Sequence, residues 1–394
     1  MRIFFSAGEP SGDQHAAHLI KELNARHVDF QPEGFGGPHM RDEGCKLHFE
    51  LTELAVMGFL AVVPMIMKFR QLVIQAENHF DQSRPDAVVL VNFSGFNWWI
   101  AKAAKKRGIP VYFYMPPQLW AWAPWRIRRV RKWVDHVICN LPFEYEWYKS
   151  RNVKATWVGH PFFDEVAARK LDADLVAELQ NRDPAQRLIG VLPGSRRHEV
   201  ERNFPVMLDV IRTVNAAVPN VRWVVGNYIE QHTQMCRQLQ ADANIDADLT
   251  YYIDRTSEVI EAAECCLMVS GSISLELLAR TTPGVVLYRA ARLPRLVARV
   301  MQTCRFITLT NLVADEELMP EYISAGDPTK HIQAMAGHLT DWCLRPETLQ
   351  DRRQRISDLA DQAAIPGATQ RTADLLLSEL TTNGTATADS SIAA

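Results

Sequence analysis

Short apolar runs alternate with longer amphipathic segments along almost the whole chain. Such runs are typical of buried parallel strands, and the segments between them, such as 15–26 and 98–107, are typical of helices that cover a sheet. This alternation predicts an α/β protein with two doubly wound, parallel-sheet domains. The predicted strands are 3–7, 87–92, 111–115, 136–140 and 156–158 in the first half, and 188–192, 223–226, 250–253, 267–270, 285–288 and 306–309 in the second.

The length of 394 residues suits two domains of ordinary size. A polar, charged stretch without a strand at 164–187 separates the two sets of strands. We therefore predict a first domain over 1–165 and a second over 166–345. Residues 346–380 are predicted to be helical, and the Ser-, Thr- and Ala-rich tail 381–394 is typical of a disordered segment.

The amino-acid composition argues against several classes of function. A formal net charge of −3 argues against a general nucleic-acid binder, which would carry a basic surplus. The seven cysteines include no C-x-x-C pair, so we predict neither a disulfide framework nor a thiolate zinc site, and a reducing compartment fits best. The adjacent Cys265 and Cys266 lie in an apolar run, which is typical of buried packing residues. The chain start lacks a secretory pattern, and the longest uncharged apolar stretch, 54–67, is shorter than the roughly 20 residues of a spanning helix.

A glycine-rich loop follows the first predicted strand and opens a helix. It reads Ala-Gly-Glu-Pro-Ser-Gly-Asp at 7–13, and its glycines permit close backbone approach, while Ser11 or Asp13 can cap the helix. Open α/β sheets bind ligands at the carboxyl ends of their strands, which is where this loop lies. The alternative is a well-capped turn that binds nothing.

Two further loops of this kind occur in the second half. The segment 192–196, Leu-Pro-Gly-Ser-Arg, offers backbone N–H groups at a helix start and a forked guanidinium suited to a diphosphate. The segment 269–277 leads a buried strand through serines and a glycine into a helix, where a glutamate could accept bonds from ribose hydroxyls. Each loop alone could be a simple helix cap, but together they predict a cradle for a nucleotide diphosphate. The residues assigned to this cradle are Gly194, Ser195, Arg196, Ser270, Gly271, Ser272 and Glu276.

No metal site is predicted. The two Asp-x-Asp triplets, at 172–174 and 246–248, lie in polar stretches without further ligands nearby in the sequence and are typical of solvated loops. Arg196 and the helix starts would instead stabilise the diphosphate of a nucleotide that leaves in the reaction. We therefore expect the turns around Ser195 and Ser272 to converge across an interdomain groove and to grip a pyrophosphate without a divalent ion.

A set of motifs resembles the lipid-A-disaccharide synthase family. The likeness spans about residues 1–380 in the same order, and the motifs at 53–58 and 119–122 are highly specific. The motifs are Ala-Gly-Glu-x-Ser-Gly-Asp at 7–13, Gly-Gly-Pro at 36–38 with Met40, Glu-Leu-Ala-Val-Met-Gly at 53–58, Phe-Asn at 96–97, Leu-Trp-Ala-Trp at 119–122, Leu-Pro-Phe-Glu at 141–144, Gly-His at 159–160, Leu-Pro-Gly-Ser-Arg at 192–196, 270–276, and Thr-Asn-Leu at 310–312.

The resemblance implies a metal-independent, inverting glycosyltransferase of the GT-B type without a cofactor. In that type two Rossmann-like domains face a central cleft, and the C-terminal helices return to the N-terminal domain and can be exchanged in a homodimer. The implied reaction moves 2,3-diacylglucosamine from UDP to 2,3-diacylglucosamine 1-phosphate through a β-1,6 linkage, in lipid A biosynthesis. The resemblance places Asn311 near the donor. It assigns the acceptor side to Glu9, Ser11, Gly12, Met57 and His160.

One position departs from the family. The strand before Phe-Asn ends in Asn92, where the family has an aspartate proposed as general base for the acceptor hydroxyl. An amide can orient a hydroxyl but cannot take its proton, and loss of a general base costs roughly 10²–10⁴-fold in rate. Glu9, Asp13 and His160 are the candidates to replace it. We favour a working enzyme; the alternatives are a paralogue that binds without turnover and a UDP-N-acetylglucosamine 2-epimerase-like enzyme.

Two features suit a lipid substrate and predict a peripheral protein on the cytoplasmic face of the inner membrane. The apolar stretch 54–67 is followed by Lys68 and Arg70, which predicts an element in the membrane interface or, alternatively, a buried helix pair. Two basic clusters suit anionic headgroups or a sugar phosphate, or form a merely solvated surface. These clusters are Arg292, Arg295 and Arg299, and Arg126, Arg128, Arg129, Arg131 and Lys132.

Overall fold

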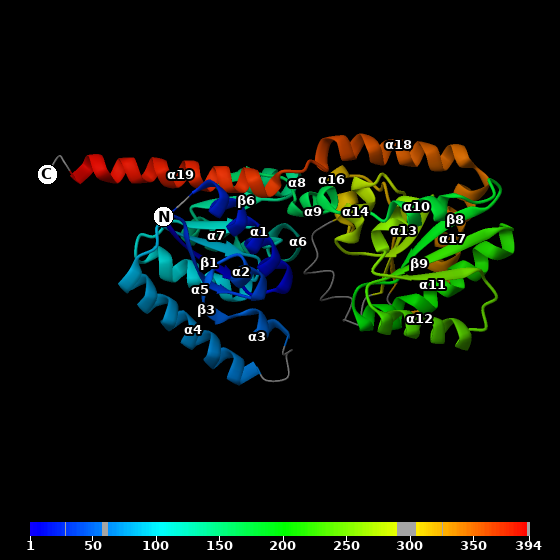
Figure 1. Ribbon diagram of the computed structural model, residues 1–394, viewed down its shortest axis with the longest axis horizontal. Coiled ribbons are helices and arrows are strands. Elements are labelled where there is room, and N and C mark those ends of the chain that lie inside the picture. Colours follow the sequence, from blue (N-terminus) through cyan, green and yellow to red (C-terminus); the bar gives the residue numbers. More distant parts are fainter. Residues whose placement is uncertain (28, 57–61, 290–304, 325, 392–394) are drawn as a thin grey trace. The chain divides into compact units, whose positions relative to one another are not determined.

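The computed structural model describes residues 1–27, 29–56, 62–289, 305–324 and 326–391. The chain forms two compact units: unit 1 holds Met1–Asp164 and Pro366–Ala394, and unit 2 holds Glu165–Ile365. Each unit contains one parallel sheet with helices packed on it (Figure 1). The α/β class predicted from the alternating pattern is therefore confirmed.

Unit 1 is built on a seven-stranded sheet with the order β3-β2-β1-β4-β5-β6-β7. The strands are β1 (Arg2–Ala7), β2 (Gln31–Gly36), β3 (Lys46–Glu50), β4 (Ala87–Val91), β5 (Val111–Tyr114), β6 (His136–Cys139) and β7 (Ala155–Trp157). The helices are α1 (Pro10–Arg26), α2 (Pro38–Asp42), α3 (Thr52–Val56), α4 (Val62–Ser83), α5 (Ser94–Lys105), α6 (Leu119–Trp122), η2 (Pro124–Arg126), α7 (Ile127–Trp133), α8 (Pro142–Lys149) and α19 (Ala368–Ser391). The unit boundary falls inside α9 (Pro161–Ala168).

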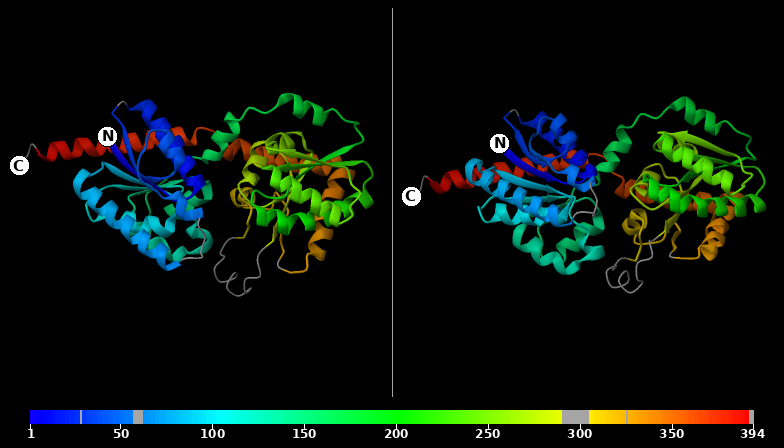
Figure 2. Two further views of the ribbon diagram at one scale, coloured as in Figure 1. Left: turned by 60° about the horizontal axis from the view of Figure 1, so that its bottom comes forward. Right: turned by 90° about the horizontal axis from the view of Figure 1, so that it is seen from below.

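Alternate residues of these strands fill two separate cores. Phe4 and Val88 belong to the cluster formed with α4, α5 and α7, whereas Phe5 and Val89 belong to the cluster formed with α1 and α19. All four side chains are fully buried. A parallel strand that is covered on both faces needs apolar residues at every position, because successive side chains point to opposite faces. Figure 2 shows α19, in red, running along unit 1.

Unit 2 has a six-stranded sheet with the order β10-β9-β8-β11-β12-β13. The strands are β8 (Arg187–Leu192), β9 (Val221–Asn227), β10 (Leu249–Ile253), β11 (Cys265–Val269), β12 (Gly284–Arg289) and β13 (Glu321–Ser324). The helices are α10 (Ala173–Gln180), α11 (Arg197–Ala217), α12 (Glu230–Asp242), α13 (Thr256–Ala262), α14 (Ile273–Ala279), α16 (Leu309–Ala314), α17 (Thr329–Leu344) and α18 (Pro346–Ala363).

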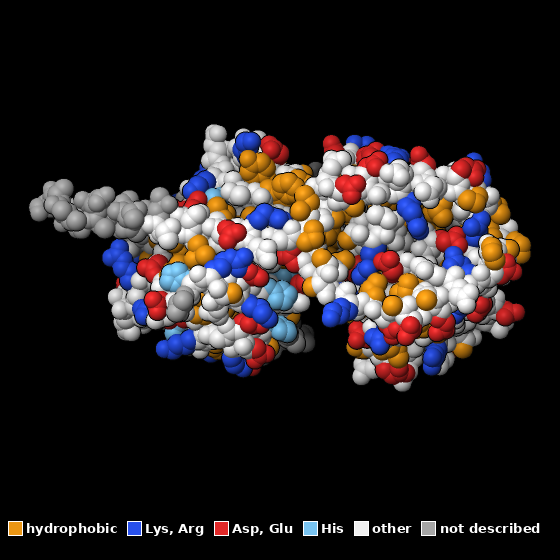
Figure 3. Space-filling view, turned by 45° about the horizontal axis from the view of Figure 1, so that its top comes forward, with side chains coloured by type: hydrophobic (Ala, Val, Ile, Leu, Met, Phe, Trp, Pro, Cys, Tyr) orange, Lys and Arg blue, Asp and Glu red, His pale blue; other side chains and the backbone are white. Residues whose placement is uncertain are grey.

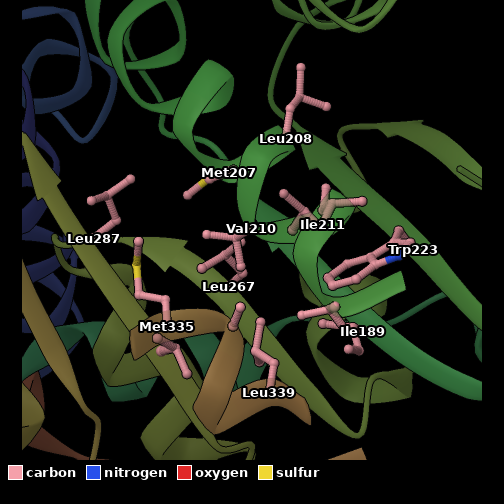
Figure 4. Close-up of a cluster of buried hydrophobic side chains, with 14 of the residues drawn as sticks. Ile189, Met207, Leu208, Val210, Ile211, Trp223, Leu267, Leu287, Met335 and Leu339 are labelled. Atoms are coloured by element: carbon pink, nitrogen blue, oxygen red, sulfur yellow. The ribbon is translucent and has the colours of Figure 1, made fainter. Parts of the chain in front are cut away.

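The main core of unit 2 lies between the sheet and the helices α11 and α17. Met207 and Val210 of α11 and Met335 of α17 pack there with Leu267 of β11 (Figure 4). Cys265 and Cys266 are both buried in β11, so their prediction as packing residues is confirmed.

Three strands are not predicted by the pattern of apolar residues in the sequence. β2 contains two glycines and Pro32, which are uncommon inside strands. A Cβ on Gly34 would lie 2.0 Å from the carbonyl oxygen of Phe5, so glycine is what allows β2 to pair closely with β1. β3 and β13 are short strands at the sheet edges, and they carry charged residues that hide their apolar pattern.

The strand predicted at 306–309 is wrong. α16 begins at Leu309. The N–H groups of Ile307 and Thr308 instead donate to the two carboxylate oxygens of Glu321 in β13, each at 2.8 Å. A side chain therefore satisfies the backbone that a neighbouring strand would otherwise have paired.

The C-terminal segment differs from the prediction in two places. α18 belongs to unit 2, where it packs on α14 and α17, so the chain returns to unit 1 at Pro366 and not at residue 346. α19 then continues to Ser391, through most of the tail that is expected to be disordered. The tail 381–394 contains no proline, so no residue in it forces the helix to end.

Candidate active site

The strand order fixes where a ligand can bind. In both sheets the order reverses beside the first strand, between β1 and β4 in unit 1 and between β8 and β11 in unit 2. Loops at the carboxyl ends of adjacent strands diverge at such a switch point and leave room for a ligand. The glycine- and serine-rich loops predicted from the sequence are the loops that follow β1, β8 and β11.

The loops after β8 and β11 line a hollow of about 150 Å³. All of its lining residues belong to unit 2. The turns around Ser195 and Ser272 therefore come together within one unit. The lining residues are Leu192, Gly194, Ser195, Arg196, Glu199, Gly226, Tyr228, Thr256, Val269, Ser270, Gly271, Ser272 and Ile273.

A carboxylate already occupies part of the predicted anion site. Oε2 of Glu199, in the first turn of α11, accepts from the N–H groups of Ser195 at 3.0 Å and Arg196 at 3.2 Å. Oε1 of Glu199 pairs with the Arg196 guanidinium at 3.0 Å. Gly194 has φ +121°, and a Cβ there would lie 2.7 Å from Glu199, so the loop closes tightly on this side chain. A bound phosphate would thus meet the guanidinium of Arg196, whose side chain is 71% exposed, more readily than these backbone N–H groups.

The structure adds two polar residues that the sequence reasoning missed. Thr256 opens α13 and is buried, and within the described part of the chain its hydroxyl has no hydrogen-bond partner. Tyr228 follows β9 and keeps 46% of its surface exposed in the hollow. Burial, and then the charge of Glu276, raises the pKa of the Tyr228 phenol, so it remains a hydrogen-bond donor. Both residues follow strands of the same sheet. They could therefore have been predicted from the rule that parallel sheets bind ligands at the carboxyl ends of their strands.

Two residues assigned to the nucleotide do not line the hollow. Glu276 is buried in α14, where Oε1 accepts from Nε of Arg280 at 3.1 Å. Asn311 is buried in α16, and its amide both donates to and accepts from the backbone of Met319, at 2.7 and 2.8 Å. The Glu276 pair spans one turn at the end of α14, whereas Asn311 joins α16 to the segment that precedes β13.

In unit 1 the loop after β1 contacts the end of β4. A Cβ on Gly8 would lie 2.1 Å from the ring of Phe93, and one on Gly12 would lie 3.6 Å from Cβ of Asn92. Asn92 and Phe93 both have left-handed backbones, with φ +49° and +43°. This conformation costs roughly 1–2 kcal/mol for each non-glycine residue, and such strain clusters at functional sites.

A buried amide holds this strained turn in place. Nδ2 of Asn97 donates to the carbonyl oxygens of Asn92 at 2.9 Å and of Ser6 at 3.1 Å, and Oδ1 accepts from the hydroxyl of Ser6 at 2.7 Å. Asn97 thereby fixes the ends of β1 and β4 to each other. This gives a structural reason for an Asn in the Phe-Asn motif.

Asp13 is engaged elsewhere. It is buried, and its carboxylate accepts from the N–H groups of Gly37 at 2.8 Å, His39 at 3.0 Å and Met40 at 3.2 Å. These donors form the start of α2. The three bonds explain the Gly-Gly-Pro motif beside Met40, and they engage the buried carboxylate so that it is not exposed as a base.

The other two candidate bases differ in exposure. Burial, and then the nearby His15, lowers the pKa of His160 to about 3, so the ring is neutral and a weak base. Its Nδ1 accepts from the N–H of Phe162 at 3.1 Å. Glu9 in the loop after β1 and Ser11 in the first turn of α1, by contrast, are exposed.

The structure describes only some of the other residues that were predicted to contact the acceptor or the lipid. Met57, Arg292, Arg295 and Arg299 lie outside the described residues. The five basic side chains predicted from Arg126 to Lys132 are exposed on η2 and α7. On the face displayed in Figure 3, basic and acidic side chains are intermingled over both units. Among the described residues, no helix combines the length and the apolar character needed to cross a bilayer.

Comparison with known proteins decides between families that share this fold. A family model described as Lipid-A-disaccharide synthetase matches residues 3–366. The chain belongs to this family. It is therefore a glycosyltransferase by family, and the predicted resemblance is confirmed.

Relatives of the lipid-A-disaccharide synthase family match along most of their length. A protein of Trichlorobacter lovleyi named lipid-A-disaccharide synthase is 30% identical over 384 residues, covering 96% of this chain and 97% of the relative. A protein of Legionella pneumophila named lipid-A-disaccharide synthase 1 is 31% identical and covers 82% of this chain and 83% of its own.

Solved structures show the same GT-B fold at low identity. A UDP-GlcNAc 2-epimerase from Neisseria meningitidis superimposes with a TM-score of 0.64 at 13% identity, covering 96% of this chain and all of that one. The calicheamicin glycosyltransferase CalG4 superimposes with a TM-score of 0.58 at 14% identity and covers 96% and 98%. The epimerase alternative is thus supported by fold alone, whereas the sequence relatives favour the synthase.

Proposed function

We propose that this member of the synthase family transfers 2,3-diacylglucosamine from UDP to 2,3-diacylglucosamine 1-phosphate, forms a β-1,6 linkage and releases UDP. The hollow of unit 2 carries the proposal, because two serine- and glycine-rich loops meet there at the switch point of the sheet. The guanidinium of Arg196 and the hydroxyl of Thr256 would bind the pyrophosphate. The exposed ring of Tyr228 would stack on the uracil.

The acceptor would bind at the loop after β1 in unit 1. There the amide of Asn92 would orient the acceptor hydroxyl, and we assign removal of its proton to Glu9. Of the three candidates, Asp13 is held by three N–H groups and His160 has a pKa near 3, whereas Glu9 is exposed. A carboxylate placed beside the acceptor hydroxyl can accept its proton as the new bond forms.

The lipid substrates require contact with a membrane surface. α4 and α5 present Ile66, Ile74 and Trp99 to solvent, with exposed fractions of 60%, 47% and 57%. These side chains line a largely apolar groove together with the cations Arg70 and Lys102. Apolar side chains edged by cations are typical of proteins that lie on an anionic bilayer. We therefore propose that the protein binds peripherally to the cytoplasmic face of the inner membrane.

Turnover and binding assays with matched variants test this function. UDP release is measured with both lipid substrates, and UDP affinity is measured by calorimetry. Asn92→Asp restores a carboxylate at the strained turn, so we expect a rate increase of roughly 10²-fold or more. Glu9→Gln lowers the wild-type rate by a similar factor and has little effect in the Asn92→Asp background.

Arg196→Ala and Thr256→Val weaken UDP binding by about tenfold or more.

Glu146→Gln is the control, because Glu146 is an exposed acid on α8 away from the candidate site. If neither the wild type nor folded Asn92→Asp releases UDP, the transferase proposal fails. Turnover by Asn92→Asp alone would identify a binding protein with a decayed site. If Arg196→Ala and Thr256→Val both leave the affinity for UDP unchanged, the nucleotide does not bind in this hollow.

A further inference from the structure

A cluster of three metal-ligating side chains lies in unit 1, apart from the loops described above. Glu33 comes from β2, His48 from β3 and His79 from α4. Nε2 of His79 lies 2.7 Å from Oε1 of Glu33, and Nε2 of His48 lies 3.4 Å from Oε2. One ligand atom from each residue lies within 4.8 Å of the other two.

The cluster is held rigidly by the core beneath it. The two imidazole rings lie 4.4 Å apart, and both pack on the fully buried ring of Phe4, at 6.1 Å for His48 and 5.8 Å for His79. Gln75 of α4 also donates to the carbonyl oxygen of His48 at 3.3 Å, which ties the helix to the edge strand. The rings therefore need little reorganisation to bind a common ligand.

One nitrogen of the cluster has an unmet hydrogen-bonding requirement. Nε2 of His48 is buried and, within the described part of the chain, has no hydrogen-bond partner. An unsatisfied buried polar atom is costly, and it points to a missing ion or water.

We propose that Glu33, His48 and His79 form a binding site for one Zn²⁺ ion. Two imidazoles and one carboxylate are a donor set typical of zinc sites with three protein ligands and one water. Ligand atoms around a tetrahedral zinc lie about 3.3 Å apart. The two nitrogen-to-oxygen distances here are 2.7 and 3.4 Å, and all three ligand atoms lie within 4.8 Å of one another. The side chains keep 9%, 17% and 16% of their surface exposed, which leaves an open side for a water ligand.

Such an ion would link three elements of unit 1. It would join β2, β3 and α4, and α4 carries the exposed apolar side chains Ile66 and Ile74. The guanidinium of Arg2 lies 3.7 Å from Oε1 of Glu33, so its positive charge opposes the binding of a cation there. The same guanidinium donates to the carbonyl oxygen of Ser83, and this bond can hold it at the edge of the site.

Metal titration of the full-length chain tests the site. The protein is treated with a chelator and then titrated with Zn²⁺ by calorimetry and with Co²⁺ by visible absorption. We expect one metal ion per chain, the absorption bands of tetrahedral Co²⁺, and a melting temperature raised by several degrees at saturating Zn²⁺. Glu33→Gln, His48→Gln and His79→Gln each weaken Zn²⁺ affinity by more than about tenfold.

His331→Gln is the matched control, because His331 lies on α17 of unit 2 outside the cluster. It should bind Zn²⁺ as the wild type does. Circular dichroism of the metal-free variants confirms that each is folded. The proposal is overturned if the wild type binds no Zn²⁺, or if folded His48→Gln and His79→Gln retain wild-type affinity and the same Co²⁺ spectrum. Either result would leave the cluster as a packed group of side chains that binds no metal.

Discussion

At the scale of the residue, Glu144 shows how a family motif can serve the fold. It is buried in α8, and its carboxyl oxygens accept from Nε1 of Trp120 at 3.3 Å and from the N–H of Asn140 at 3.4 Å. Burial raises the pKa of Glu144 to about 8, and the hydrogen bonds only partly oppose this effect. The side chain thus joins the motif at 119–122 to the motif at 141–144 and is largely protonated at neutral pH.

This pKa predicts a pH dependence of stability. Between pH values of about 4.5 and about 8, the unfolded chain has lost the Glu144 proton while the folded chain keeps it, so the free energy of unfolding falls as pH rises. Glu144→Gln mimics the protonated form and should flatten this slope. Urea unfolding at the two ends of this window measures it. An equal slope in both proteins would show that Glu144 does not cause the dependence.

Much of the candidate site follows from single residues and their spacing. The loops containing Ser195 and Ser272 are recognisable because each follows an apolar run and precedes a helix. The position of Thr256 after a strand is readable, but the absence of a hydrogen-bond partner for its hydroxyl among the described residues depends on packing that no local pattern encodes. The role of Glu199 was accessible in principle, because an acid three residues into a helix is the signature of a capping box.

At the scale of the element, α19 is attached to unit 1 by a partly buried ionic cluster. Oε1 of Glu379 lies 2.8 Å from Nδ1 of the buried His136 and 2.6 Å from Nζ of Lys154. Earlier in the same helix, Asp374 is 67% exposed and pairs with Arg26 of α1 at 3.2 Å. Two ion pairs of different burial thus hold one helix to the same unit.

Burial should decide what each pair contributes. Glu379→Gln leaves His136 and Lys154 without their carboxylate, and we expect a loss of about 1–2 kcal/mol in the stability of α19. Asp374→Asn, the exposed control, should cost less than about 0.5 kcal/mol. Hydrogen exchange of the α19 amides measures both. Equal protection in the two variants would contradict this ranking.

Elements with strong apolar runs, such as β4 and β11, are readable from the sequence because both of their faces are buried. β2 is not readable, because its pairing depends on the absence of a side chain at Gly34. α18 is readable as a helix, but its membership of unit 2 depends on long-range packing. Local pattern therefore gives the element, while tertiary contacts decide where it belongs.

At the scale of the whole molecule, the apolar surface of α4 and α5 predicts membrane attachment. The double variant Ile66→Asp, Ile74→Asp removes two exposed apolar anchors and adds charge that repels anionic lipid. Burying an isoleucine contributes roughly 1.5–3 kcal/mol, so we expect binding to weaken by more than about tenfold. Cosedimentation with vesicles containing phosphatidylglycerol measures the effect.

Leu344→Asp provides the comparison, since Leu344 is 59% exposed at the end of α17 in unit 2. It should sediment with vesicles as the wild type does. If both variants lose binding equally, general hydrophobicity and not the surface of α4 and α5 would account for attachment.

The discontinuity of unit 1 bears on how the protein is made. Ala373 and Leu376 of α19 complete a core whose other members come from the first half of the chain. While the ribosome is still translating unit 2, that core has no cover on this side. A nascent chain would therefore carry an open apolar surface through synthesis of some two hundred further residues, Glu165–Ile365. Such a chain is the kind that chaperones protect, and the core of unit 1 should be complete only when α19 emerges.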